Sequence, residues 1–130
     1  MAHVQSTSEG SYSATTSHEI ALTGVAAGNV LIVACRGASG GSNDMSSVSS
    51  SQDGAFTALS EVSNGTVRLR MFVLENASSG THTVTGTAAS TGLSFRWALL
   101  EYDNAPASGV VEFHDAFPTP KQAFYRTVQP

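Results

Sequence analysis

Charged residues are scarce in this sequence of 130 residues. They make up 12% of the chain, about half the share found in an ordinary globular protein. Lys121 is the single lysine, and the formal net charge is −4. Binding to the phosphates of a nucleic acid requires a cluster of Lys and Arg side chains. The composition therefore argues against a nucleic-acid partner.

Cysteine is almost absent. Cys35 is the only one, which excludes an internal disulfide and a metal site made of several thiolates. It ends the apolar run Val30–Cys35. We therefore expect a buried, small hydrophobic residue rather than a reactive thiol.

Long apolar runs are also absent. None approaches the roughly 20 residues that a membrane helix needs, so no membrane partner is expected. The first ten residues, MAHVQSTSEG, lack the charged and apolar regions of a secretory signal. We expect the chain to be synthesised in a cytoplasm, without a signal peptide.

Hydroxyl side chains supply most of the polarity, because the chain holds 19 Ser and 13 Thr. Threonine suits the exposed face of a β-strand, and serine suits turns. Hydrophobic residues make up 41% of the chain, which is enough for the core of one domain. This balance indicates an all-β protein.

Short segments of alternating apolar residues, bounded by turn residues, predict a series of strands. The candidate strands are 18–24, 30–35, 47–51, 55–62, 66–75, 81–87 and 93–103. Segment 30–35 is apolar on both parities, which is typical of a central strand covered on both sides. Asn64-Gly65 indicates a hairpin. No segment shows a helical period with caps, so we predict an antiparallel, jelly-roll-like β-sandwich over residues 1–114.

Alternation also assigns side chains to the two faces of each strand. The side chains expected in the core are Ile20, Leu22, Val67, Leu69, Met71, Val73, Leu93, Phe95, Trp97 and Leu99. Arg68, Arg70 and Arg96 have the opposite parity and are expected to face water.

One stretch matches a catalytic pattern. Gly37-Ala38-Ser39-Gly40-Gly41 fits G-x-S-x-G, the nucleophile elbow of α/β-hydrolases, which needs a strand, a turn and a helix on a parallel sheet. The residues after Ser39 are rich in glycine and serine and make a poor helix. The pattern also arises easily in a chain with 12 Gly and 19 Ser. We expect Ser39 to be a loop residue and the protein not to be an enzyme.

No metal or cofactor site is predicted. The four histidines are scattered, and no pair has the spacing of a metal site. His18-Glu19 and His114-Asp115 are interpreted as solvated residues at strand ends. Asn43-Asp44 and Asp53 leave open an oxygen-rich calcium site in the loops. The carboxylates expected to be solvated at strand ends are Glu61, Glu75, Glu101 and Glu112.

Sugar binding would use exposed aromatic rings beside polar groups. Trp97 shares the parity of Leu99 and is expected in the core. Tyr12, Phe72 and Tyr102 lie on outward parities and are the better candidates for contact with a glycan.

The sequence changes character after Asn104. A short strand is expected at Val110–His114, followed by an extended C-terminal arm, residues 115–130. Residues 117–130 carry a charge of +2, against −6 for residues 1–116. Proline-rich extended segments lose little entropy on binding, so docking on a neighbouring molecule is preferred over docking on the same sandwich. The predicted partner-binding residues are Phe117, Pro118, Pro120, Lys121, Phe124, Tyr125 and Arg126.

The stretches LTGVAAGNVLIVAC, SSVSSSQDGAFTAL, ENASSGTHTVTGT and ALLEYDNA resemble a jelly-roll-like β-sandwich module of bacteriophage virion proteins and bacterial surface proteins. The resemblance covers residues 18–104, about two thirds of the chain. Its motifs are turns and core positions, so it implies a fold and no catalytic residue.

The resemblance implies a virion structural protein, either a capsid decoration protein or a small tail component. Such a protein is expected on the virion surface, as a homo-oligomer that binds a capsid or tail protein through its sheet edges and its arm. The absence of a signal, tandem repeats and a linker favours this over a secreted adhesin. The alternative is a carbohydrate-binding or adhesion module that recognises a host glycan.

Overall fold

The computed structural model describes residues 1–13, 16–38, 45–64, 67–88 and 93–104. All regular elements in these ranges are strands, and none is a helix. The strands are β1 (His3–Ser13), β2 (Ser17–Val25), β3 (Val30–Ala38), β4 (Met45–Ser50), β5 (Gly54–Ala55), β6 (Thr57–Ala58), β7 (Val62–Ser63), β8 (Val67–Leu74), β9 (Gly80–Ala88) and β10 (Leu93–Tyr102). The predicted all-β class is confirmed.

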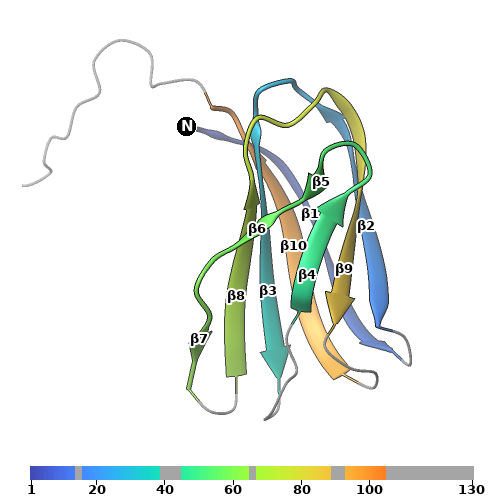
Figure 1. Ribbon diagram of the computed structural model, residues 1–130, viewed down its shortest axis with the longest axis vertical. Coiled ribbons are helices and arrows are strands. Elements are labelled where there is room, and N and C mark those ends of the chain that lie inside the picture. Colours follow the sequence, from blue (N-terminus) through green and yellow to red (C-terminus); the bar gives the residue numbers. More distant parts are fainter. Residues whose placement is uncertain (14–15, 39–44, 65–66, 89–92, 105–130) are drawn as a thin grey trace, which may run out of the picture.

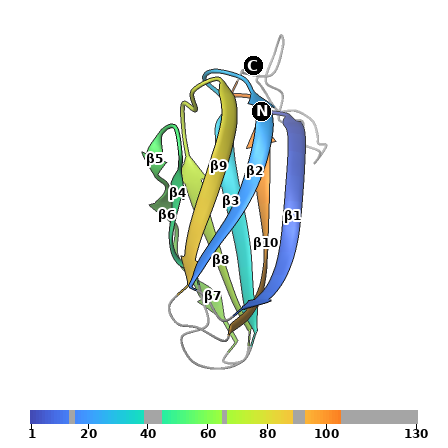
Figure 2. The same ribbon diagram turned by 90° about the vertical axis from the view of Figure 1, so that its right-hand side faces the viewer.

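The strands form two antiparallel sheets that pack face to face (Figures 1 and 2). Sheet A has the order β1-β10-β3-β8-β6, with β7 also paired to β8, and sheet B has the order β2-β9-β4-β5. The pairs are nested, because β1 pairs with β10, β2 with β9 and β3 with β8. Nested pairing across two sheets is the arrangement of a jelly roll. The sandwich prediction is therefore confirmed in its topology.

Two strand predictions need correction. The strand β1 was not predicted, because its sequence HVQSTSEGSYS carries hydroxyl and charged residues where an alternating strand would have apolar ones. The single strand expected over residues 55–62 is replaced by the three two-residue strands β5, β6 and β7. The predicted hairpin at Asn64 is present, since β7 pairs with β8 and the Asn64 N–H donates to the carbonyl of Val67.

The core lies between the sheets and follows the period of two that strands impose. Ile20 and Leu22 are buried on β2, as predicted, and Trp97 and Leu99 are buried on β10. Cys35 is buried as well, in agreement with its expected role as a small hydrophobic residue. The side chains of Leu93 and Phe95 lie outside the described part of the structure. The loop containing Ser39 and the arm from residue 115 also lie outside it.

The facing of β8 was predicted wrongly. Leu69 is 46% exposed and Met71 is 37% exposed, whereas Phe72 is 1% exposed and Leu74 is 8% exposed. Both parities of this strand carry large apolar residues, and the core takes the parity that includes the phenyl ring. The prediction placed Arg68 and Arg70 on the outer face because they are charged. In the structure they share the inner parity of Phe72.

Those two arginines lie on the inner parity of β8, and each guanidinium contacts another side chain of the protein. Arg68 is ion-paired to Glu61, with Nη1 at 3.0 Å from a carboxylate oxygen. The guanidinium of Arg70 lies 5.6 Å from the centre of the Phe72 ring, within the range of a cation–π contact.

The central position of β3 is confirmed, but its predicted cover on both sides is not. Leu31, Val33 and Cys35 are buried toward sheet B, whereas Ile32 and Ala34 on the opposite face are only half-buried. No described element packs on that outer face of sheet A. The chain thus has one apolar strand that the sandwich covers on a single side.

The close approach of the two sheets requires a glycine at position 86. A Cβ atom at Gly86 of β9 would collide with the thioether of Met45 and would lie 3.3 Å from the Trp97 ring. Small size at this position lets the indole fit beneath sheet B. The glycine of the motif TVTGT is therefore a packing requirement.

Candidate functional site

The predicted partner-binding residues all lie beyond Asn104, outside the described residues. They are Phe117, Pro118, Pro120, Lys121, Phe124, Tyr125 and Arg126. The structure does describe where the chain leaves the sandwich. The Asp103 N–H donates to the carbonyl of Ala2 at 2.8 Å, and the Ala2 N–H donates to the Asp103 carboxylate at 3.0 Å. The beginning and the end of the described chain are thus joined at one end of sheet A, the upper end in Figure 1.

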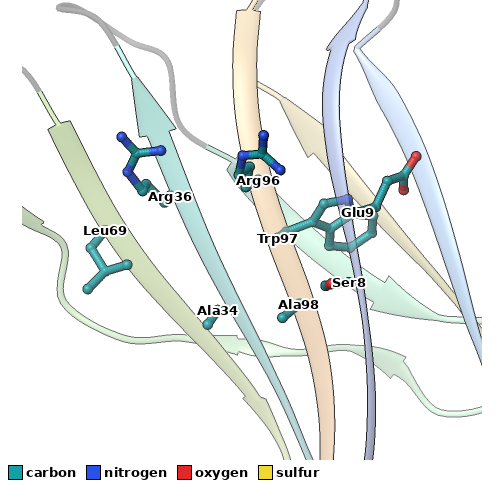
Figure 3. Close-up of a pocket in the computed structure, with 8 residues that line it drawn as sticks. All are labelled: Ser8, Glu9, Ala34, Arg36, Leu69, Arg96, Trp97 and Ala98. Atoms are coloured by element: carbon teal, nitrogen blue, oxygen red, sulfur yellow. The ribbon is translucent and has the colours of Figure 1, made fainter.

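The outer face of sheet A carries a hollow of about 410 Å³ (Figure 3). Ala34 of β3 and Ala98 of β10 form part of its lining, and their small side chains leave the space. Arg36 and Arg96 lie next along the same two strands and pair directly across them. Leu69 lines the hollow from β8. Ser8 and Glu9 line it from β1, so the lining combines apolar side chains with two cations and one acid.

A second hollow of about 450 Å³ lies toward the other edge of sheet A. Thr57, Leu59, Val73 and Glu75 contribute to its lining. Leu59 is 44% exposed. The outer face therefore exposes apolar side chains from β10 across to β6.

Glu101, predicted to be a solvated carboxylate at a strand end, is in fact fully buried. Its Oε2 accepts a hydrogen bond from Gln5 Nε2 at 2.7 Å. Its Oε1 accepts from Asn29 Nδ2 at 2.7 Å and from the Ala26 N–H at 3.0 Å. One carboxylate thereby joins β10 to β1 and to the turn between β2 and β3.

The pKa of Glu101 lies below the usual value for glutamate. Burial alone acts to raise it, but the hydrogen bonds from the Ala26 N–H, Gln5 and Asn29, with a smaller contribution from nearby His82, together outweigh the burial. A depressed pKa in the folded state means that the ionised carboxylate stabilises the fold. This stability is present above the pKa of the unfolded chain, about 4.3, and is lost as the pH falls through the lower folded value.

Glu101→Gln is therefore expected to lower the free energy of unfolding at pH 7 by about 1.5–3 kcal/mol, since hydrogen bonds to a charged group are lost. The difference from the wild type should begin to shrink as the pH falls below the pKa of the unfolded chain, about 4.3, because the stability that the ionised wild-type carboxylate contributes is progressively lost. Urea unfolding of both proteins at pH 7 and pH 3 measures this. Glu19→Gln, at an exposed position of β2, is the control and should change little. An equal deficit at both pH values would contradict the assignment.

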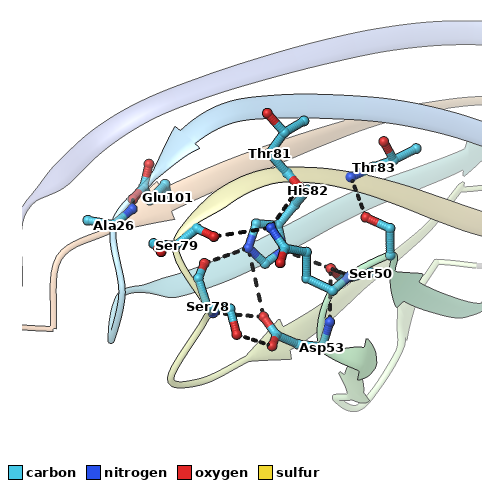
Figure 4. A network of polar contacts seen from close by, with 11 residues as sticks. Ala26, Ser50, Asp53, Ser78, Ser79, Thr81, His82, Thr83 and Glu101 are labelled. Atoms are coloured by element: carbon cyan, nitrogen blue, oxygen red, sulfur yellow. Dashed lines mark hydrogen bonds and ion pairs between the residues drawn. The ribbon is translucent and has the colours of Figure 1, made fainter.

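A second buried polar cluster lies on sheet B beneath the turn between β8 and β9 (Figure 4). His82 of β9 is fully buried, and its Nδ1 lies 2.7 Å from Ser50 Oγ. Its Nε2 lies 2.8 Å from the carbonyl oxygen of Ser78, which can only accept, so Nε2 donates. In the neutral ring, Nδ1 then accepts from the Ser50 hydroxyl.

Ser50, His82 and Asp53 are the residue types of a catalytic triad, but their geometry is not that of one. The Asp53 carboxylate lies 3.8 Å from His82 Nε2, too far for the hydrogen bond that orients a catalytic imidazole. Ser50 is 6% exposed, and its Oγ also accepts from the Gln52 N–H at 3.1 Å. Neither hollow described above borders this serine. The cluster holds a turn in place and offers no nucleophile to a substrate.

Asp53, one of the residues for which a calcium site was left open, accepts hydrogen bonds from the protein itself. Its carboxylate accepts from the Ser78 hydroxyl at 2.6 Å and from the Ser78 N–H at 2.8 Å. These hydrogen bonds, the side-chain one first, lower the pKa of Asp53. Asn43 and Asp44 lie outside the described residues. Within the described ranges, no three side chains of His, Cys, Asp or Glu are grouped so that they could hold a metal ion.

The aromatic residues considered for contact with a glycan differ in their exposure. Phe72 is buried, contrary to the prediction, and Trp97 is buried as expected. Tyr102 is half-buried and forms an edge-to-face contact with His3, with ring centroids 5.5 Å apart. The side chain of Tyr12 lies outside the described part. Of the three candidate rings, Tyr102 alone is placed at least partly on the described surface.

The chain matches no protein-family model, and no curated protein is significantly similar to it. In the described ranges there is no helix of the length and apolar character needed to cross a membrane. The description of the site therefore depends on the geometry of this chain alone.

Sequence reasoning missed the buried polar residues, although one signal marked them. Glu101 has the parity of Trp97 and Leu99, and His82 has the parity of Val84. His18, predicted to be solvated, has the parity of Ile20 and is 7% exposed. For these three residues the parity within the strand agrees with the observed burial, whereas the assumption that polar residues face water does not.

Proposed function

We propose that this protein is a structural component of a virion, a capsid decoration protein or small tail component. It binds a protein shell through its sheet edges and its C-terminal arm, residues 115–130, and forms homo-oligomers on the virion surface. The jelly-roll topology is compatible with this role, but a fold of this kind serves many functions. The proposal therefore depends on surfaces rather than on the fold.

The observation that carries the proposal is the long edge strand β1. It spans eleven residues and, within the described chain, its backbone pairs in the sheet with β10 alone. An edge strand of this length presents unpaired backbone groups to which a neighbouring chain can add a strand. Its side chains from Val4 to Glu9 are exposed or half-buried, and they include no Lys or Pro that would block pairing.

The arm contributes three aromatic residues and two cations, Lys121 and Arg126, whereas residues 1–116 carry a charge of −6. Opposite charge would steer the arm toward an acidic neighbour, and buried aromatic rings are frequent anchors of protein interfaces. Both features favour binding to another protein molecule. The glycan-binding alternative is weakened by the burial of Phe72.

The proposal is tested by mass-spectrometric analysis of particles purified from the source organism. Recovery of this chain in many copies per particle, at a fixed ratio to the major shell or tail protein, is the expected result. A chain found only in the fraction without particles would contradict the proposal. Saturable binding of the isolated protein to a glycan array, without recovery in particles, would favour the carbohydrate-binding alternative.

A further inference from the structure

The middle of the outer face of sheet A carries three consecutive rows of side chains that run across β10, β3 and β8. Strand pairing gives the rows as Leu100–Ile32–Val73, Ala98–Ala34–Met71 and Arg96–Arg36–Leu69. The first two rows are entirely apolar. The third of these rows, the one of the three farthest from the upper end, places two arginines side by side.

This face is apolar and lacks cover. Met71 and Leu69 are 37% and 46% exposed, and the other apolar members of the rows are half-buried. Sheet B packs on the opposite side of sheet A, and no described element lies over the rows (Figures 1 and 2). A continuous apolar face of this kind marks a surface that another segment or molecule covers.

The arginine pair indicates the charge of the covering segment. Arg36 and Arg96 are directly opposite each other in the register, and both are exposed. Like charges placed opposite one another in a sheet are destabilising. Neither guanidinium forms an ion pair with an acidic group of the described chain. A carboxylate placed over the pair would relieve the repulsion.

The residues just beyond the described chain match this pattern. In an extended segment Val111, Phe113 and Asp115 share one side, because side chains alternate. Their order, apolar, apolar, acidic, is the order of the three rows counted from the upper end. Residues 105–116 hold two acids, Glu112 and Asp115, and no Lys or Arg.

The chain is long enough to return over the face. Val111 lies seven positions after Asn104, and seven steps of extended chain span up to about 25 Å. The return needs about 10 Å along β10, for the three residues from Leu100 to Asp103, and about 10 Å to reach the packing distance above the sheet. Pro106 and Gly109 in the connecting sequence APASG favour a turn there.

We propose that residues 110–116 pack on the outer face of sheet A of their own chain, antiparallel to β10. Val111 covers the first row. Phe113 fills the hollow above Ala34 and Ala98, and Asp115 binds Arg36 and Arg96. The rest of the arm, from residue 117, then begins at the lower end of the sandwich, opposite the end that holds Asn104. This inference does not depend on the proposed function.

The outer face is more readily covered by residues 110–116 of the same chain than by those of a second copy. A segment tethered to its site has an effective concentration in the millimolar range, far above that of a second copy at micromolar protein. The connection is long enough and begins at the edge of the face, so the tether does not prevent binding.

The methyl signals of the three methionines provide a direct test in the full chain. Met71 lies in the second row, whereas Met45 is buried in the core and serves as an internal reference. Phe113→Ala and Asp115→Arg are expected to shift the Met71 methyl signal and to leave the Met45 signal in place. Glu112→Arg is the matched control, since in the proposed arrangement its side chain points away from the face, and it should leave both signals unchanged. An unshifted Met71 signal in the Phe113 and Asp115 variants would overturn the proposal.

A spin label distinguishes the same chain from a second copy. The label is attached to His114→Cys in a chain carrying Cys35→Ala, and it should broaden the amide signals of Ala34, Met71 and Ala98. Amides of Ala21 and Thr83 on sheet B should stay sharp. A mixture of isotope-labelled chains without the spin label and spin-labelled chains without the isotope should show no broadening. Broadening in that mixture would show that a second copy covers the face. In the singly labelled chain, broadening confined to Ser6 and Ser8 would place the segment at the β1 edge. Either result overturns the proposal.

Discussion

Replacing Phe72 with alanine should lower the free energy of unfolding by about 3–5 kcal/mol, the usual cost of removing a buried ring. Phe72 is 1% exposed in the core between the sheets. The surrounding side chains can only partly close the space that the ring leaves. The variant should still fold if the wild type has ordinary stability, but with a much lower denaturation midpoint.

Leu69→Ala is the matched control on the same strand. Leu69 is 46% exposed on the outer face, so its truncation should cost less than about 1 kcal/mol. Urea denaturation of both variants measures the difference directly. Similar losses for the two variants, or a larger loss for Leu69→Ala, would show that β8 turns its other face to the core, because a slip of one residue reverses every side chain.

The contrast between these two residues shows what the sequence could and could not predict. On β2 and β10 one parity is clearly more apolar than the other, and the buried residues Ile20, Leu22, Trp97 and Leu99 were all assigned correctly. On β8 both parities are apolar, so alternation alone cannot choose. The choice depends on the register with β3, which places Phe72 opposite the buried Val33.

Polar residues inside the sandwich could not be predicted from their chemical type. Glu101 is buried because three donors from distant segments converge on its carboxylate. All three donors, on Gln5, Ala26 and Asn29, lie more than seventy residues earlier in the chain. The nested topology brings them together, and no local pattern of LLEYD contains that information.

The outer face of sheet A was missed for a related reason. Segment 30–35 was interpreted as covered on both sides because it is apolar on both parities. In the described structure sheet B covers one side only, and Ile32 and Ala34 remain half-buried. The prediction and the structure agree if residues 110–116 supply the missing cover, which gives the apolar pattern of β3 a physical reason.

Truncation after His114 should leave a chain that folds but does not assemble. The described sandwich contains both sheets and a buried core without any residue of the arm. The strand spectrum and a cooperative thermal transition should therefore be preserved, although loss of Asp115 can weaken the segment on the outer face. The arm residues Phe124 and Tyr125 are the expected anchors of the interface. If each is a hot-spot residue, its truncation to alanine should weaken binding by about 2 kcal/mol or more. Loss of both should abolish binding to the particle.

The most direct test of the assembly role compares incorporation of the full chain and the chain truncated after His114 into particles of the source organism. Phe124→Ala/Tyr125→Ala in the full chain separates the aromatic anchors from the rest of the arm, and Thr81→Ala, at an exposed position of β9, is the control. We predict normal copy number for the full chain and the control, and loss of particle-bound protein for the truncated chain and the double variant. A truncated chain that folds and enters particles at the normal copy number would contradict the assembly role of the arm.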